Sequence, residues 1–187
     1  HYIEGGWPNP TNPKDLAFFD EVRALNLKST VTAFGSTRRA TNAPEDDAIL
    51  NTLLKADTSS ITIFGKSWDL HVTKVLQTTR EQNLALIEDS VAYLVSEGRD
   101  VTYDAEHFFD GYHADAEYAL QTLKAAERGG ARIAVLCDTN GGRLPTEIQQ
   151  MCSVASEALN IPLGIHAHND SGMGAANTIA AVELGAI

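Results

Sequence analysis

The chain alternates short apolar runs with longer stretches in which apolar residues recur every three or four positions. The first pattern predicts buried strands, and the second predicts amphipathic helices. Six strand–helix units follow one another. The predicted strands are residues 1–6, 29–36, 59–66, 99–108, 132–142 and 161–170. The predicted helices are residues 12–26, 43–56, 67–98, 114–130, 144–160 and 172–186.

Several helix boundaries carry their own signals. Asn12 is a candidate N-cap directly before Pro13, which suits the first helical position. Acidic residues open the helix at 43–56, where the helix macrodipole favours them. The long stretch 67–98 is expected to break near Gln77–Arg80 and to end at Gly98.

Regular alternation of strands and helices predicts a parallel sheet covered by helices. An open doubly wound sheet and a (β/α)8 barrel both satisfy this pattern. A complete barrel needs ~250 residues for eight units, so six units need roughly 190, and the chain has 187. No glycine-rich phosphate-binding loop follows the first strand, which weakens a nucleotide-binding open sheet. We therefore predict one α/β domain over residues 1–187, an incomplete TIM (β/α)8 barrel of about six units.

Composition narrows the class of protein. The chain is 43% hydrophobic and has a formal net charge of −11. An acidic chain is a poor partner for nucleic acid, because phosphates are neutralised by clustered Lys and Arg. No apolar run approaches the ~20 residues of a membrane helix, and no secretory signal is visible. Cys137 and Cys152 form no disulfide framework and fit a reducing compartment, so we expect a cytoplasmic protein that binds neither nucleic acid nor membrane.

Polar side chains gather where each predicted strand ends. Because the carboxyl ends of parallel strands meet at one face, sites form there. The six groups, in chain order, are Glu4; Ser36, Thr37 and Arg38; Lys66, Ser67, Asp69 and His71; Asp104, Glu106 and His107; Asp138, Thr139 and Asn140; and His166, His168, Asn169 and Asp170. This distribution indicates a site rather than six solvated turns.

The segment GIHAHND, residues 164–170, carries the most specific signal. Residues i and i+2 of a strand point to the same face, so His166 and His168 are expected to aim together into the site. Two imidazoles spaced this way can bind one metal cation. A satisfied core histidine is the alternative for either residue taken alone.

Other candidates have weaker signals. Asp104 and Glu106 share a face by the same alternation and can act as acid and base or orient ligands, although a structural pair at a strand end is as common. Thr139 can donate a hydrogen bond to a substrate oxygen or cap a turn. His71 lies one turn into a helix and reads equally as a surface histidine. Cys137 is expected to be buried core.

Six segments together resemble the (R)-citramalate synthase branch of the 2-isopropylmalate and homocitrate synthase family, part of the wider DRE-TIM metallolyase superfamily. They are YIEGGWPNPTNPKD, VTAFGSTRR, FGKSWDLHV, YDAEHFFDGY, CDTNGG and GIHAHND, and they span the whole chain. The resemblance implies an acyltransferase that condenses acetyl-CoA with pyruvate, with a divalent cation, Mg²⁺ or Mn²⁺, chelating the keto acid. The product would be (R)-citramalate, on the route to isoleucine.

The same resemblance assigns roles to individual residues. His166 and His168 would be metal ligands. Glu106 would be a catalytic carboxylate near the keto acid. Substrate contacts would come from Thr139, which is also expected to be catalytic, and from His71, Asp104 and Glu4. The base that removes the acetyl proton is not assigned.

Relative to the family, the chain is expected to supply barrel strands two to seven. The first strand, with its Arg-Asp pair, and the last strand, with an Asn ligand, would lie outside it, so the isolated chain is expected to be inactive. The full-length enzyme is expected to be a homodimer. Three alternatives stay open, namely a 2-isopropylmalate synthase acting on 2-oxoisovalerate, a related metal-dependent lyase, and a domain with a vestigial metal site.

Overall fold

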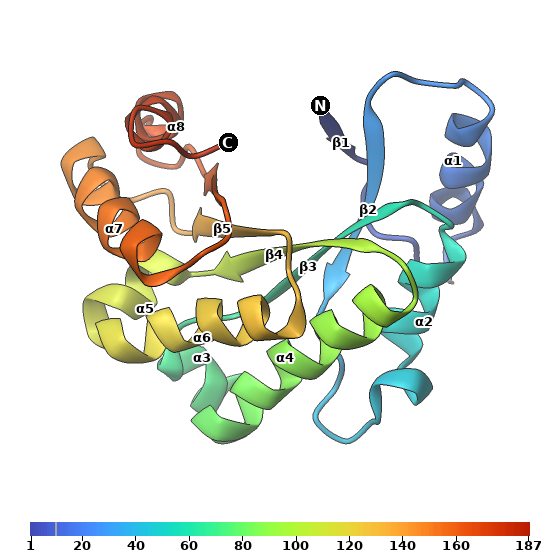
Figure 1. Ribbon diagram of the computed structural model, residues 1–187, viewed down its shortest axis with the longest axis horizontal. Helices are drawn as coiled ribbons and strands as arrows, with labels where there is room; N and C mark the ends of the chain where they lie inside the picture. Colours follow the sequence, from blue (N-terminus) through green and yellow to red (C-terminus); the bar gives the residue numbers. More distant parts are fainter. Residues whose placement is uncertain (10) are drawn as a thin grey trace.

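The computed structural model describes residues 1–9 and 11–187, and within them six parallel strands form one curled sheet (Figure 1). The strands are β1 (Tyr2–Glu4), β2 (Thr30–Ser36), β3 (Ser60–Lys66), β4 (Asp100–Glu106), β5 (Ile133–Asp138) and β6 (Leu163–Ala167). Each strand pairs with the next in the chain, in the order β1-β2-β3-β4-β5-β6. A doubly wound sheet would reverse its strand order at a switch point. The sequential order therefore confirms the incomplete α/β barrel.

Helices cover the outer side of the sheet, from α1 beside β2 round to α7 and α8 beside β6 (Figure 1). They are α1 (Pro13–Arg23), α2 (Ala48–Lys55), α3 (Asp69–Lys74), α4 (Arg80–Ser96), α5 (Phe108–Ala114), α6 (Ala116–Gly129), α7 (Pro145–Ala158) and α8 (Gly174–Val182), with the short 3-10 turn η1 (Pro44–Asp46) before α2. Within the described residues, no helix combines the length and the apolar character that crossing a membrane requires.

Strand alternation gives the sheet two different faces. Ile61, Ile63 and Tyr103 are fully buried beneath the helices and belong to the hydrophobic core. The alternate residues face the concave side, which is partly polar. There the hydroxyl oxygens of Thr32 and Thr62 lie 3.4 Å apart across β2 and β3. The core therefore lies between sheet and helices, and the concave face is left for chemistry.

The helix boundaries follow most of the predicted signals. Asn12 accepts a hydrogen bond from the backbone of Lys14 and caps α1. The stretch 67–98 breaks into α3 and α4 at Gln77, whose φ is +53°. The acidic residues near 45 form the 3-10 turn, and Asp47 caps α2 instead.

The prediction was wrong at the end of the fourth strand. The strand stops at Glu106, His107 adopts a left-handed φ of +55°, and residues 108–114 form α5. The helix α5 is only seven residues long and begins with two fully buried aromatic residues, Phe108 and Phe109. Such a short segment contains too few turns for a helical period to be visible in the sequence. As a result His107 begins a helix rather than extending a strand.

Candidate active site

His166 and His168 come together at the carboxyl end of β6. Their ring centroids are 4.8 Å apart and the ring planes are inclined by 24°. The alternation expected from the sequence is therefore present. His166 is the last inward residue of the strand, and His168 follows directly after it.

A carboxylate on the second strand away, across β5, fixes one of these rings. Asp104 on β4 lies 2.8 Å from His166, Oδ2 to Nδ1, and only 4% of Asp104 is exposed. An ionised carboxylate has no proton to give, so the ring N–H donates. This hydrogen bond, and then the nearby Cys137 sulfur, raise the pKa of His166 to about 10, although burial opposes them. A metal ion binding this ring would have to displace a proton.

Cys137 completes a group of possible ligands. One ligand atom each from Cys137, His166 and His168 lies within 4.8 Å of the others. The thiol is buried as expected, but it faces the concave side beside His166 rather than the apolar core, and burial raises its pKa. Imidazole nitrogens bind transition-metal dications, of which Mn²⁺ is the weakest, more readily than they bind Mg²⁺, which prefers oxygen ligands. The two imidazoles, with a carboxylate oriented behind one of them, fit a divalent cation.

Glu106 lies at the end of β4, where its carboxylate forms an ion pair with Lys66 of β3. The two residues are direct partners in the parallel register of these strands. Both side chains are largely shielded from solvent. Glu106 is thus held at the mouth of the barrel by a cation from the adjacent strand.

Thr139 connects the ends of β4 and β5. Its hydroxyl accepts a hydrogen bond of 2.7 Å from the backbone N–H of His107 and donates one of 3.2 Å to the Cys137 sulfur. The hydroxyl proton is therefore already used within the protein, and a remaining lone pair is what Thr139 can offer a ligand.

His71 is not a surface histidine. Its ring lies between Trp68, at 4.9 Å, and His107, at 4.5 Å between centroids. Burial and the neighbouring His107 lower the pKa of His71, and Lys66 and Glu106 lie near enough to influence it. Its Nδ1 is buried with no hydrogen-bond partner among the described residues. These contacts place a neutral imidazole beside the Lys66–Glu106 pair.

Glu4 on β1 faces the same interior. A cavity of about 340 Å³ is lined by Glu4, Thr62, Asp104 and His166 together with Thr102 and Val135. The pKa of Glu4 is raised, first because its carboxyl group loses contact with water and second because the charge of Asp104 is close. The structure thus brings Glu4, Asp104 and His166 around one space, while His71 and Glu106 gather on the other side of the mouth.

Comparison with known proteins identifies the family of the chain. A protein-family model described as HMGL-like matches residues 1–187. The chain belongs to the HMGL-like family. It is similar to the (R)-citramalate synthases of Aquifex aeolicus, at 53% identity over 100% of the chain, and Geobacter sulfurreducens, at 50% identity over 100%. The chain spans 35% of the length of each.

More distant similarities support the family and the fold. A probable 2-isopropylmalate synthase of Methanopyrus kandleri is 30% identical over 98% of the chain, which covers 34% of that protein. Among solved structures, the HMG-CoA lyase of Bacillus subtilis superposes with a TM-score of 0.76 at 16% identity, covering 98% of this chain and 61% of that one. Within the HMGL-like family, the high identity thus concentrates on citramalate synthases.

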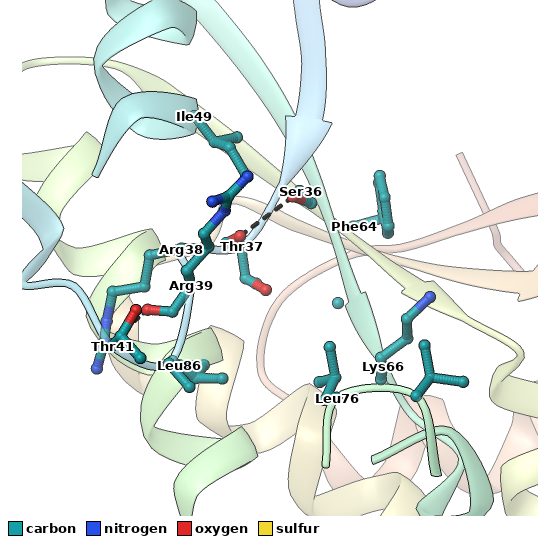
Figure 2. A pocket seen from close by; sticks show the side chains of 13 residues that line it. Ser36, Thr37, Arg38, Arg39, Thr41, Ile49, Phe64, Lys66, Leu76 and Leu86 are labelled. Carbon is teal, nitrogen blue, oxygen red and sulfur yellow. Dashed lines mark hydrogen bonds between the residues drawn. The ribbon is translucent and has the colours of Figure 1, made fainter. Parts of the chain in front are cut away.

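A second cavity of this HMGL-like chain opens beside Glu106, at the ends of β2 and β3. It has a volume of about 420 Å³ and is lined by the polar side chains of Thr37, Arg38, Arg39 and Lys66 and by apolar side chains such as Leu76 and Leu86 (Figure 2). Lys66 lines this cavity and also pairs with Glu106. The cavity therefore adjoins the carboxylate at the mouth.

Five residues around the site are given no role by the sequence. The sequence marks Lys66 and His107 only as strand-end residues, and Cys137 as core. His107 and Asp110 form a hydrogen bond of 2.9 Å, and Arg143 reaches Asp110 at 2.7 Å. The spacing of Cys137, in β5, and Thr139, directly after it, is an available signal, because alternate residues of a strand share a face.

Proposed function

We propose that this chain forms the metal-binding and keto-acid-binding part of an acyltransferase that condenses acetyl-CoA with pyruvate to give (R)-citramalate. The observation that carries the proposal is the convergence of His166 and His168 at the mouth of the barrel. Similarity over the whole chain to (R)-citramalate synthases supports the choice of reaction. Because the chain spans about a third of those proteins, the activity belongs to a full-length enzyme.

In this reaction the methyl group of acetyl-CoA loses a proton, its carbon bonds to the ketone carbon of pyruvate, and water cleaves the thioester. A divalent cation held by His166 and His168 supplies Lewis-acid polarisation of the ketone when bound. Asp104 holds the His166 ring, and Lys66 holds the carboxylate of Glu106 at the mouth. Among the described residues we assign no base for the methyl proton.

The second substrate has room in the cavity beside Lys66. Its exposed Arg39 offers a cation to the phosphates of acetyl-CoA, and its apolar wall suits the pantetheine arm. The thioester would then arrive next to Glu106. This arrangement lets the two substrates approach the mouth from different sides.

The identity of the metal, the oligomeric state and the cellular location are further parts of this proposal. Mg²⁺ and Mn²⁺ are the ions that the family resemblance implies, and the two imidazoles favour Mn²⁺ of the two. The homodimeric state of the full-length enzyme, its cytoplasmic location and its place in isoleucine biosynthesis stay predictions.

The test is a hybrid of the Aquifex aeolicus (R)-citramalate synthase in which this chain replaces the matching segment. Release of free CoA is measured with acetyl-CoA and either pyruvate or 2-oxoisovalerate, with Mn²⁺ present. We expect turnover with pyruvate and a loss of at least about 100-fold in His166→Ala and His168→Ala. His113→Ala, an exposed histidine on α5, is the matched control and should keep full activity.

A folded hybrid that uses only 2-oxoisovalerate would replace the proposal by the 2-isopropylmalate reaction. A hybrid whose activity is the same with and without either histidine substitution would contradict the proposed metal site. If the hybrid does not fold, the 187-residue chain itself decides by calorimetric titration with Mn²⁺. The proposal requires one binding event that His168→Ala removes and His113→Ala retains.

A further inference from the structure

Asp104 occupies an unusual position in the middle of the sheet. It lies on β4 between Phe64 of β3 and Val135 of β5 in the register of the sheet. Its Oδ2 is bonded to His166, and its Oδ1 is buried without a hydrogen-bond partner among the described residues. The contact that the structure gives Asp104 is therefore with His166, a proposed metal ligand, and the substrate contact expected from the sequence stays a prediction.

Stability of the fold does not explain this residue. Removing a carboxylate from water costs several kcal/mol unless its oxygens are satisfied. One oxygen of Asp104 is not satisfied within the described structure, and the residue is 4% exposed. A neutral side chain at this position would carry a smaller desolvation cost. The carboxylate is therefore explained by the one group that it contacts, the imidazole of His166.

We infer that Asp104 is a positioning residue for the metal site, which accepts the Nδ1–H of His166 and thereby directs Nε2 of that ring to the cation shared with His168. An imidazole bonded at Nδ1 to a carboxylate has only Nε2 left as a ligand atom, and its ring cannot rotate without breaking the bond. The near-parallel arrangement of the two imidazoles, 24° between planes, fits this restraint. The inference rests on the proposed function and assigns Asp104 a role behind the ligand rather than at the substrate.

The Cys137 sulfur reinforces the restraint from the next strand. Cys137 is the register partner of His166 across β5 and β6, and its sulfur lies within 4.8 Å of a ring nitrogen of His166. Thr139 in turn donates to that sulfur. Two side chains therefore flank the His166 ring, and Asp104, which is bonded to Nδ1, decides which nitrogen faces outward.

The experiment compares Asp104→Ala and Asp104→Asn with the unchanged 187-residue chain. The dissociation constants for Mn²⁺ and Zn²⁺ are measured by calorimetry, and the Nδ1–H proton of His166 is followed by NMR in the diamagnetic Zn²⁺ form. Asp100→Asn is the matched control, because Asp100 lies on the same strand but pairs with Arg132 at the surface.

We expect Asp104→Ala to bind both ions about 10- to 100-fold more weakly and to lose the protected Nδ1–H signal. Asp104→Asn keeps an acceptor oxygen and should recover part of the affinity and the signal, which a residue needed only for folding would not produce. The control should match the unchanged chain. Circular dichroism verifies that each variant is folded.

Metal affinity and the Nδ1–H signal that are unchanged in folded Asp104→Ala would overturn the inference while leaving the proposed function intact. The opposite result is equally distinguishable. Affinity that depends on Asp104, combined with a full-length hybrid that releases no CoA from acetyl-CoA and pyruvate, would support the positioning role and defeat the proposed reaction.

Discussion

Gly111 is the point at which α5 presses against the loop after β3, and replacing it with alanine tests this packing. The added methyl carbon would lie 2.1 Å from the Ser67 carbonyl oxygen, 2.8 Å from the Ser67 carbonyl carbon and 3.0 Å from the Trp68 Cα. A carbon and an oxygen normally approach no closer than about 3.3 Å. The helix and the loop must therefore separate by about 1 Å.

The cost follows from what has to move. All three close atoms belong to the backbone, so no side-chain rotation can relieve the contact. Overpacking of this kind costs about 1–3 kcal/mol, and we expect the upper end for Gly111→Ala. For a chain of this size that corresponds to a Tm lowered by roughly 6 to 12 °C. The shift should also disturb Trp68, which carries the contact to His71.

The assay is thermal unfolding followed by far-UV circular dichroism, with the near-UV signal of the native state as a second reading. Gly142→Ala is the control, because a methyl group there meets no atom within 4 Å and the residue does not have a positive φ. Its Tm should stay within about 1 °C of the unchanged chain. A Gly111→Ala variant with the same Tm as the Gly142→Ala control would refute the close approach of α5 to this loop.

The other two predictions concern side chains that organise the loops around the mouth. Asp47 is fully buried and accepts hydrogen bonds from three backbone N–H groups and one side-chain amide. Asp47→Ala should lower the free energy of unfolding, measured in urea, by about 2–4 kcal/mol. Substitution of its exposed neighbour, Asp46→Ala, should change that free energy little, and equal effects of the two substitutions would contradict the capping role. Burial raises the pKa of Asp110, but hydrogen bonds from His107 and Arg143 outweigh it and leave the pKa below its ordinary value of 3.8. Ionised Asp110 therefore stabilises the fold above pH 3.8, and this contribution disappears as the pH falls through the lowered value. The stability advantage over Asp110→Asn in urea titrations should be constant near neutral pH and shrink in acid; an advantage that persists throughout the acid range would be inconsistent with the ionised network.

The architecture could be predicted from the sequence because it depends on periodicity. Six strand patterns alternate with helical patterns, and parallel strands joined in this way form one sheet with one chemical face. The inward direction of His166 and His168 follows from the same alternation. Side-chain parity is a local property, and the sequence is sufficient to determine it.

What could not be predicted depends on register and on short elements. The pairing of Lys66 with Glu106 requires knowing which residues of β3 and β4 are opposite each other. The alternation of apolar and polar residues excludes a shift by one residue, but a shift by two leaves the same faces buried. The bond from Asp104 to His166 spans three strands for the same reason. The turn at His107 was missed because α5 is short and its first residues are apolar.

The central claim is that His166 and His168 hold one divalent cation between them, and anomalous X-ray scattering from crystals of the chain grown with Mn²⁺ tests it most directly. We predict one strong anomalous peak at metal–nitrogen bonding distance from both rings, with Asp104 still bonded to Nδ1 of His166. A peak bound to one ring alone, a peak elsewhere on the chain, or no peak at a Mn²⁺ concentration far above physiological levels would contradict the account.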